Sequence, residues 1–311
     1  MGQEFLARKE SAMENRFFKA QVMMEGVTRI EGLGCEYAYL IEGTERALLV
    51  DGLVGIGSLK SFVKELTDLP VSVALTHAHI DHNGGAYEYG ECYMHPYDIP
   101  MLYPQKGEIP GTGLAIHGDR QLKLDYVTKG GFEKLDRSWL SLEDVVQMGP
   151  IKTYPVFQGE VFDLGGVQIE VAELPGHTNG TIVFLDRKRR ILFSGDACNS
   201  YTLLGIPGTT TIEDYKEALE RFWAKYGGTF DVMYGGHGTL PPEIISDAIQ
   251  LCEKILKRED AQIPTTHRGY PQFLAREREN EGLCNIVYSG DKLYKKAVPQ
   301  VIKDAPIIER K

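Results

Sequence analysis

The chain has 311 residues, of which 42% are hydrophobic and 25% are charged, and these fractions exclude wholesale disorder and a fibrous structure. Its 34 basic and 44 acidic side chains give a net charge of -10. Nucleic acid is therefore not expected as a partner, because binding its backbone requires a broad positive surface.

Short β-type runs, separated by turns that contain glycine, dominate the first part of the chain. A helix is expected over 58–68, where apolar residues recur at helical spacing, and a buried strand is expected over 71–76. Strand, helix and strand in this order predict an α/β layered fold. The expected early strands are 20–27, 36–43 and 46–52.

From about residue 97 to residue 150 the periodicity weakens while Pro, Gly and aromatic residues gather, so we expect an insert over the core. Strand patterning returns after it, and helices are expected over 211–228 and 241–259. After residue 260 the chain is expected to be irregular, except for one β-type run over 283–290. The expected strands of the second half are 160–174, 181–186, 189–196 and 230–234.

Nothing in the sequence predicts a membrane or secreted protein. No run of 18 apolar residues is present, and charges interrupt the first residues, where a signal peptide would be apolar. The five cysteines are scattered and form no C-x-x-C pair, which fits a reducing compartment rather than a disulfide framework. We therefore expect a cytoplasmic protein that does not bind membranes. The sequence leaves its oligomeric state open, a homodimer included.

Three of the eight histidines gather in THAHIDHNGG, directly after the expected strand over 71–76. His77 and His79 would face one side of an extended backbone, whereas Asp81 and His82 project differently once the chain turns. Imidazole suits zinc and related transition metals, and a carboxylate adds an oxygen ligand. The segment thus offers four donors within six residues, and the arrangement fits two metal ions better than one.

Two ions need more ligands than this segment offers, so other strand ends should supply donors. His177 follows the run VQIEVAEL, Asp196 ends the run RILFSGD, and His237 follows FDVM. Each of them stands immediately after an apolar β-type run and is flanked by glycine. We therefore expect these three side chains to join the cluster.

The motifs THAHIDHNGG, PGHTNG, SGDA and GGHG, in this order, resemble the metallo-β-lactamase-fold hydrolase superfamily over roughly residues 20 to 240. The resemblance implies a four-layer αββα sandwich with two metal ions at one edge of two facing sheets. Zinc is the expected metal, with manganese or iron as alternatives. The resemblance implies one ion held by His77, His79 and His177, a second held by Asp81, His82 and His237, and Asp196 bridging both.

The resemblance leaves the insert and the C-terminal residues unassigned. Because no linker rich in Gly, Ser or Pro separates independent domains, we expect a hydrolase domain over 1–240 that includes the insert at about 97–150, with a C-terminal helix and extension over 241–311 packed on the same domain. LLVDG resembles the family's early Asp motif, in which Asp51 would orient metal ligands without binding the metal. An ordinary turn aspartate is the alternative interpretation of Asp51.

The implied reaction is hydrolysis of a small molecule. Coordination lowers the pKa of bound water from near 16 to about 7, so a hydroxide bridging two zinc ions would attack a carboxylic ester, thioester or lactone. The leaving group would take its proton through Asp81, Asp196 or water. Tyr201 is a candidate donor to the developing oxyanion, as a tyrosine is in related lactonases, although their spacing differs and a packing role is the alternative.

The insert supplies weaker candidates for contact with the substrate. Tyr97, Tyr103 and Trp139 could form an apolar wall of the substrate pocket, although such residues more often belong to a core. His117 is a further candidate contact.

Other activities share this ligand set. β-Lactamases of the superfamily typically lack the bridging Asp and carry secretion signals, and a phosphodiesterase of the RNase Z type is disfavoured by the acidic balance. Di-iron proteins that reduce oxygen or nitric oxide usually have Glu in place of His79 and an added flavin domain. Glyoxalase-II-like thioesterases and lactonase-like esterases share the full set. A binding module without catalysis is disfavoured because all seven ligands are present.

Overall fold

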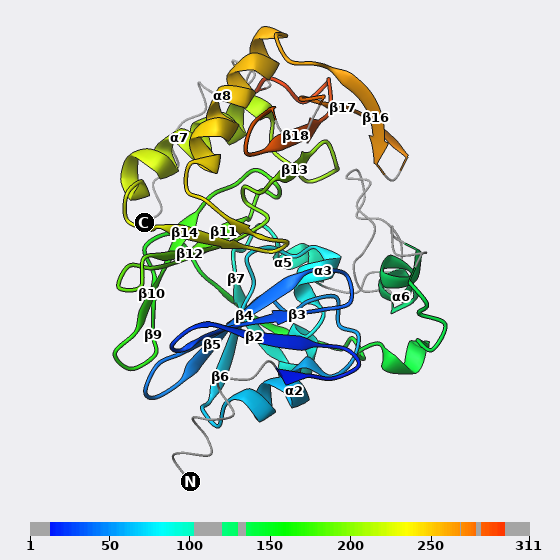
Figure 1. Ribbon diagram of the computed structural model, residues 1–311, viewed down its shortest axis with the longest axis vertical. Coiled ribbons are helices and arrows are strands. Elements are labelled where there is room, and N and C mark those ends of the chain that lie inside the picture. The colour runs from blue at the N-terminus through cyan, green and yellow to red at the C-terminus, as the bar shows by residue number, and fades with distance from the viewer. Residues whose placement is uncertain (1–12, 103–119, 130–134, 268, 278–280, 296–311) are drawn as a thin grey trace, which may run out of the picture.

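Two β-sheets face each other and carry helices on their outer faces (Figure 1). The structure is a computed structural model that describes residues 13–102, 120–129, 135–267, 269–277 and 281–295. Within these ranges, no helix combines the length and the apolar character that crossing a bilayer requires.

The first sheet has eight strands that lie side by side in chain order. Strands β1 to β5 pair antiparallel and β5 to β8 pair parallel, so the later strands end at one common edge. The strands are β1 Met13–Glu14, β2 Lys19–Met24, β3 Val27–Glu31, β4 Tyr37–Glu42, β5 Ala47–Val50, β6 Val71–Ala74, β7 Glu91–Met94 and β8 Lys152–Pro155.

The second sheet has six strands in the order β15-β14-β12-β11-β10-β9, of which only β12 and β14 pair parallel. The run expected over 160–174 forms two strands, because Gly165 and Gly166 turn the chain with φ of 83° and 71°. The strands are β9 Val161–Asp163, β10 Gln168–Glu173, β11 Ile182–Asp186, β12 Ile191–Gly195, β14 Val232–Gly235 and β15 Thr239–Leu240.

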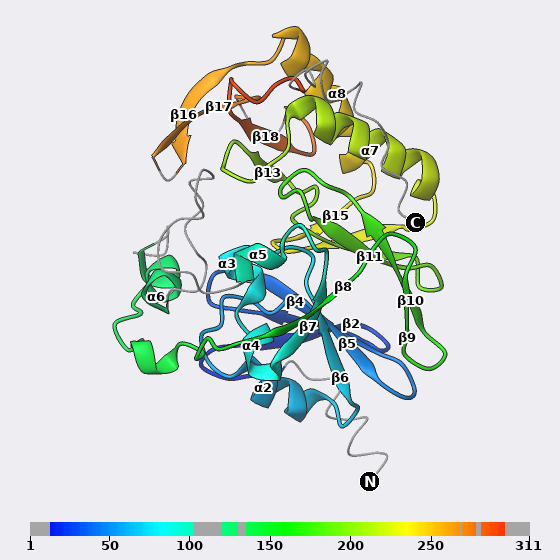
Figure 2. The ribbon, with the colours of Figure 1, turned by 180° about the vertical axis from the view of Figure 1, so that it is seen from behind.

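The three expected long helices are confirmed. Helix α2 begins at Leu59 because the hydroxyl of Ser58 accepts a hydrogen bond from the backbone N–H of Ser61, and its apolar side packs on the first sheet. Helices α7 and α8 pack on the second sheet and lie together on the side of the molecule away from α2 (Figure 2). The helices are α2 Leu59–Leu66, α3 Ile80–Asn83, α4 Ala86–Tyr89, α5 Ile99–Leu102, α6 Arg120–Lys129, α7 Ile212–Tyr226 and α8 Ile244–Lys257.

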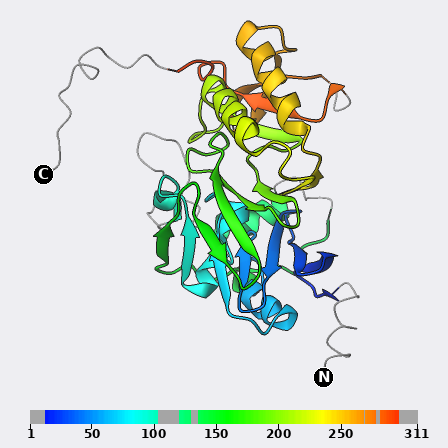
Figure 3. The ribbon, with the colours of Figure 1, turned by 90° about the vertical axis from the view of Figure 1, so that its left-hand side faces the viewer.

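A buried apolar layer joins the two sheets. Tyr39 and Val50 of the first sheet pack there with Phe184 and Phe193 of the second, and all four side chains are at most 2% exposed. Helices, sheet, sheet and helices therefore follow one another across the molecule, which confirms the four-layer αββα sandwich (Figure 3).

The expectation of an irregular chain after residue 260 is wrong. A third sheet of four strands, in the order β13-β18-β17-β16, lies beside α8. Prolines inside two of its strands interrupt the sequence pattern that predicts a strand, because proline lacks the backbone N–H that pairs with a neighbouring strand. Pro264 is tolerated because β16 is an edge strand, and Pro271 because β18 pairs only with Phe273 and Leu274 of β17. The strands are β13 Tyr201–Leu204, β16 Ile263–His267, β17 Tyr270–Leu274 and β18 Asn285–Tyr288.

The insert contributes short elements, of which α5 packs in the core beside the first sheet and α6 packs on the loop after β5. Helix α5 begins it, α6 lies in its middle, and one 3-10 turn over Leu142–Asp144 precedes β8. Two expected substrate contacts, Tyr103 and His117, lie outside the described residues.

Candidate metal centre

The seven side chains singled out in the sequence lie together at one edge of the two sheets. The chain leaves β6 through Thr76, passes His77 and His79, and enters α3, which carries Asp81 and His82 (Figure 1). The other three follow strands β10, β12 and β14 of the second sheet, and they are His177, Asp196 and His237. Parallel strands deliver their carboxyl ends to a common edge, which explains why distant segments meet here.

Three overlapping groups of these side chains have ligand atoms within 4.8 Å of one another. Asp196 reaches both halves of the cluster, because its Oδ2 lies 3.6 Å from His177 Nε2 and 3.4 Å from His237 Nε2. The groups are His77 with His79 and His177, His77 with His82 and Asp196, and Asp81 with His82 and His237. The first and third groups coincide with the two ligand sets that the resemblance implies.

Several atoms of the cluster have no hydrogen-bond partner among the described residues although they are buried. They are His77 Nε2, His82 Nε2 and Asp196 Oδ1. A buried polar atom left unpaired costs about 1–3 kcal/mol, so three of them in one place call for a bound group. Imidazole nitrogens and carboxylate oxygens are ligands for zinc, manganese and iron, and the donor set therefore fits a metal centre.

The carboxylates of the centre are ionised and its histidines differ in charge. Burial, followed by the neighbouring histidines, holds the pKa of His77 well below its usual range, so its ring is neutral. Burial alone would raise the pKa values of Asp81 and Asp196, but His82 and His237 hold both well below the usual range. Burial opposes the charge of His237, yet Asp196 and Asp81 outweigh it and raise its pKa to about 12.

Hydrogen bonds on the far side of the rings fix how the histidines face the centre. His177 Nδ1 lies 2.9 Å from the carbonyl oxygen of Leu203, and His237 Nδ1 lies 3.2 Å from that of Cys35. A carbonyl oxygen can only accept, so both Nδ1 atoms carry hydrogen. In the neutral rings Nε2 is then the nitrogen that can bind a metal.

Asp51 does orient a histidine of the cluster. Its Oδ2 lies 2.8 Å from His82 Nδ1, and its Oδ1 accepts a 2.7 Å hydrogen bond from the backbone N–H of Thr76. The Thr76 hydroxyl in turn lies 3.0 Å from His77 Nδ1. One buried carboxylate thus links the rings of two of the clustered histidines.

Asp98 is a residue of the site that sequence reasoning missed. Its carboxylate accepts hydrogen bonds from the backbone N–H of Ala78 at 3.1 Å, from that of Gly180 at 3.0 Å and from the Thr178 hydroxyl at 2.8 Å. It is 2% exposed, and burial raises its pKa to about 6. Asp98 therefore ties the loop that carries His77 and His79 to the loop that carries His177. No local pattern in the sequence marks it.

The insert reaches the centre through a residue that was not expected. On α6, the hydroxyl of Tyr126 donates a 2.9 Å hydrogen bond to Asp81 Oδ2. The aromatic residues that were expected do not show such a contact: Tyr97 is 72% exposed, and the ring of Trp139 lies 5.8 Å from that of Phe17.

Tyr201 stays a prediction. It begins β13, its side chain is 49% exposed, and its hydroxyl makes no hydrogen bond to the seven clustered residues. The same strand contacts the centre through the carbonyl of Leu203 instead.

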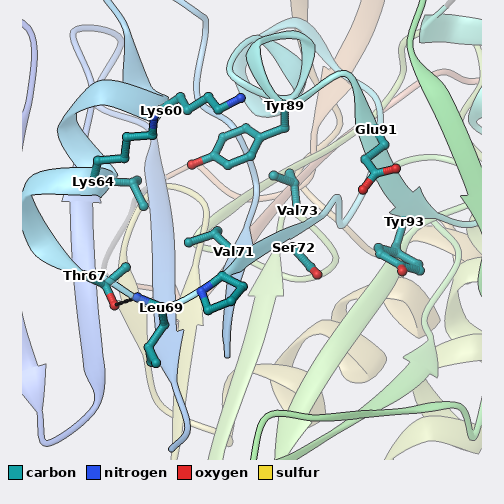
Figure 4. A pocket seen from close by; sticks show the side chains of 12 residues that line it. Lys60, Lys64, Thr67, Leu69, Val71, Ser72, Val73, Tyr89, Glu91 and Tyr93 are labelled. Atoms are coloured by element: carbon teal, nitrogen blue, oxygen red, sulfur yellow. Dashed lines mark hydrogen bonds between the residues drawn. The ribbon is translucent and has the colours of Figure 1, made fainter. Parts of the chain in front are cut away.

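A separate cavity of about 340 Å³ lies at the opposite end of β6 (Figure 4). Lys60 and Lys64 of α2 border it, together with Tyr89 and the first residues of β6. None of the seven clustered residues lines it, so this cavity is not part of the metal centre.

Comparisons with known proteins agree with this arrangement. A sequence model of the metallo-beta-lactamase superfamily matches residues 34–267. The acyl-coenzyme A thioesterase MBLAC2 of Gallus gallus is 25% identical over 194 residues, which are 59% of this chain and 65% of that protein. That of Homo sapiens is 26% identical over 196 residues, again 59% of this chain and 65% of that protein. The matched region thus spans slightly less than two thirds of these relatives.

A solved structure shows the same fold. A metallo-beta-lactamase family protein of Thermus thermophilus superposes with a TM-score of 0.53 at 20% sequence identity, over 79% of this chain and 86% of that one.

Proposed function

The chain belongs to the metallo-beta-lactamase superfamily, and on that premise we propose that it is a hydrolase that cleaves a carboxylic ester, thioester or lactone of a small molecule at two zinc ions. The observation that carries this proposal is the convergence of five imidazoles and two carboxylates, with buried atoms that lack a partner among the described residues. The similarity to acyl-coenzyme A thioesterases favours a thioester among the three substrate classes.

The clustered residues would form two ligand sets that share Asp196. The ligands would be His77, His79 and His177 for one ion, Asp81, His82 and His237 for the other, and Asp196 for both. Bound there, zinc supplies Lewis acidity that makes water nucleophilic near pH 7 and polarises a carbonyl oxygen. Manganese and iron are the alternatives, since the same donors suit them.

The chain's own groups orient the ligands and move the proton. The carbonyls of Leu203 and Cys35 and the carboxylate of Asp51 hold three rings with Nε2 toward the centre. Asp81 and Asp196 are the two carboxylates of the cluster, so we assign to them the transfer of the proton of the reacting water to the leaving group. Tyr201 remains a candidate donor to the developing oxyanion.

Two further parts of the proposal concern the whole chain. All five cysteines are free and four of them are buried, which supports a cytoplasmic location because reducing compartments keep thiols unpaired. Helix α8 shares its buried core with α7 and the second sheet, which supports a single domain that includes the C-terminal helix.

Metal analysis and a panel of substrates test the proposal. The purified protein should hold two zinc ions per chain and cleave an ester, an acyl thioester or a lactone in preference to a phosphodiester or a β-lactam. His82→Ala and Asp196→Ala should each lose one ion and reduce kcat/KM by more than about 100-fold, since ligands matter more than the partners that orient them. His267→Ala, a histidine outside the cluster, should keep both ions. Undiminished turnover by metal-free protein would refute the proposal.

A further inference from the structure

Helix α6 of the insert is anchored against the metal centre. Lys123, Tyr126 and Val127 share one side of the helix, because they are three and four residues apart. Val127 is fully buried with Val54 and Ile56. Lys123 is also fully buried, and its ammonium donates a 2.9 Å hydrogen bond to the side-chain oxygen of Asn83, the last residue of α3. The helix is therefore fixed to α3, the element that carries Asp81 and His82.

This anchoring places the Tyr126 hydroxyl on one oxygen of Asp81. The hydrogen bond is 2.9 Å long and ends on Oδ2, the same oxygen that lies 3.4 Å from His237 Nε2. On its other side the phenol ring is seated against Gly34, where an added Cβ would come within 2.7 Å of the ring. The ring thus fills the space between the Gly34 loop and α3.

The Tyr126 hydroxyl is a hydrogen-bond donor to Asp81 from outside the cluster. Asp81 lies in the first turn of α3, a four-residue helix without a side-chain cap, and its other close neighbours are His82 and His237 of the cluster. Without a further hydrogen bond its carboxylate could rotate away from them. A phenol suits the task because it donates a hydrogen bond without adding a positive charge beside a cation site.

We propose that Tyr126 is a positioning residue of the metal centre, whose hydrogen bond holds the Asp81 carboxylate in the orientation that lets it share one ion with His82 and His237. This inference rests on the proposed function, because it presupposes an ion at that position. Partners that orient metal ligands typically change metal affinity by about 10–100-fold, and a loss of this size is expected at one of the two ion sites.

Tyr126→Phe tests this role, with Tyr226→Phe as the matched control. The control removes a similar 3.0 Å hydrogen bond from a buried tyrosine to a carboxylate, that of Glu170, which is not in the cluster. Zinc affinity is measured by competition with a chelator, and the absorption spectrum is recorded after replacement of zinc by cobalt(II). Tyr126→Phe should keep one ion at wild-type affinity, bind the second about 10–100-fold more weakly and change the cobalt spectrum. Tyr226→Phe should match the wild type in both affinities and in the cobalt spectrum.

Further measurements distinguish a folding defect from a failure of the Tyr126 role and from a failure of the proposed function. Circular dichroism and the melting curve in chelator report whether Tyr126→Phe is folded. If it is not folded, Tyr126→His serves as the second variant, because histidine keeps a hydrogen-bond donor. Tyr126→His should then bind the second ion more tightly than Tyr126→Leu does. A wild type with two ions and a Tyr126→Phe variant with unchanged affinities and spectrum would overturn this inference alone. A wild type that binds no second ion would overturn the proposed function together with it.

Discussion

Glu36 is a buried carboxyl group beside the metal centre, and it is not one of the seven proposed ligands. Its Oε1 accepts a 3.1 Å hydrogen bond from the backbone N–H of Val54, whereas its Oε2 has no partner among the described residues. Glycines make room for it, since an added Cβ at Gly32 or Gly34 would come within 2.5 Å of a carboxyl oxygen. Burial, reinforced by the charge of Asp81, raises the pKa of Glu36 to about 7.

Glu36→Gln should therefore change how stability depends on pH. The pKa in the folded protein, about 7, lies above the ordinary value of 4.5, so the folded state holds this proton more tightly than the unfolded state. The resulting stabilisation is fully present when the pH is below the ordinary pKa of 4.5, and it is lost as the pH rises through 7. The lost stabilisation amounts to about 3–4 kcal/mol, at about 1.4 kcal/mol for each pKa unit. Glutamine can still accept from Val54 but never ionises.

Urea denaturation in chelator at pH 5 and pH 8 measures the effect. The free energy of unfolding of Glu36→Gln, relative to the wild type, should be higher at pH 8 than at pH 5. Glu25→Gln, at an exposed position, should show little difference between the two pH values. A difference for Glu36→Gln that is the same at both pH values would show that Glu36 does not titrate as described.

The clustered histidines and aspartates were predictable from sequence, and so was Asp51, which orients His82, but two other groups that hold the cluster were not. His177 and Asp196 each follow an apolar run beside glycine, and this local pattern places them at strand ends. Asp98 and Tyr126 have no such pattern. Their roles depend on the backbone N–H of Gly180 and on one oxygen of Asp81, which only the folded chain brings to them.

At the scale of elements, the third sheet contributes a strand, β13, whose backbone contacts a histidine of the metal centre. Strand β13 pairs parallel with β18, with Tyr201 opposite Asn285 and Leu204 opposite Tyr288. This pairing fixes the Leu203 carbonyl against His177. The sequence predicted the run that contains β18 but not β13. It also missed the β16–β17 hairpin, because prolines in the hairpin break the alternation that marks a strand.

Helix α3 docks onto the loop after β5 through backbone hydrogen bonds. The N–H of Gly84 donates to the carbonyl of Leu53 at 2.8 Å, and the N–H of Gly52 donates to the carbonyl of His82 at 2.6 Å. The approach is so close that a Cβ at Gly84 would lie 2.1 Å from the carbonyl oxygen of Val54 and 2.2 Å from its carbon. Neither neighbour is a flexible side chain, so the backbone itself would have to move.

Gly84→Ala should therefore destabilise the protein and disturb the ligands that α3 carries. Overpacking of this kind typically costs about 1–3 kcal/mol, and a contact with backbone belongs at the upper end of that range. Gly149→Ala is the matched control, because a Cβ there meets nothing within 4 Å. Urea denaturation and metal content are measured for both variants. Equal stability and equal metal content of the two would contradict the proposed docking.

On the scale of the whole molecule, the metal centre joins the two sheets. His77, His79, Asp81 and His82 follow a strand of the first sheet, whereas the remaining three ligands follow strands of the second. Without an ion, the contact between these two groups places an ionised carboxylate against a charged histidine, as at Asp81 of the first group and His237 of the second. An ion would replace the protons on these rings and connect both sheets through ligand bonds.

Removal of metal should accordingly lower the melting temperature by an amount that depends on pH. Zinc at 1,000 times its Kd stabilises a folded protein by about 4 kcal/mol if the unfolded chain does not bind it. Burial disfavours the charge of His237, but Asp196 and Asp81 raise its pKa to about 12 in the ion-free protein, so binding must displace its proton at any pH near neutrality. Each displaced proton makes the affinity rise about tenfold for each pH unit.

Melting curves with zinc and with chelator at pH 6, 7 and 8 check this expectation. The gap between the two melting temperatures should widen as the pH rises, because fewer protons then compete with the ion. In His237→Gln, which has no proton to displace at that position, the gap should be smaller and should widen less steeply with pH. A gap of constant size in the wild type would mean that the ion does not displace protons from these histidines, and the absence of any gap would mean that no ion connects the sheets.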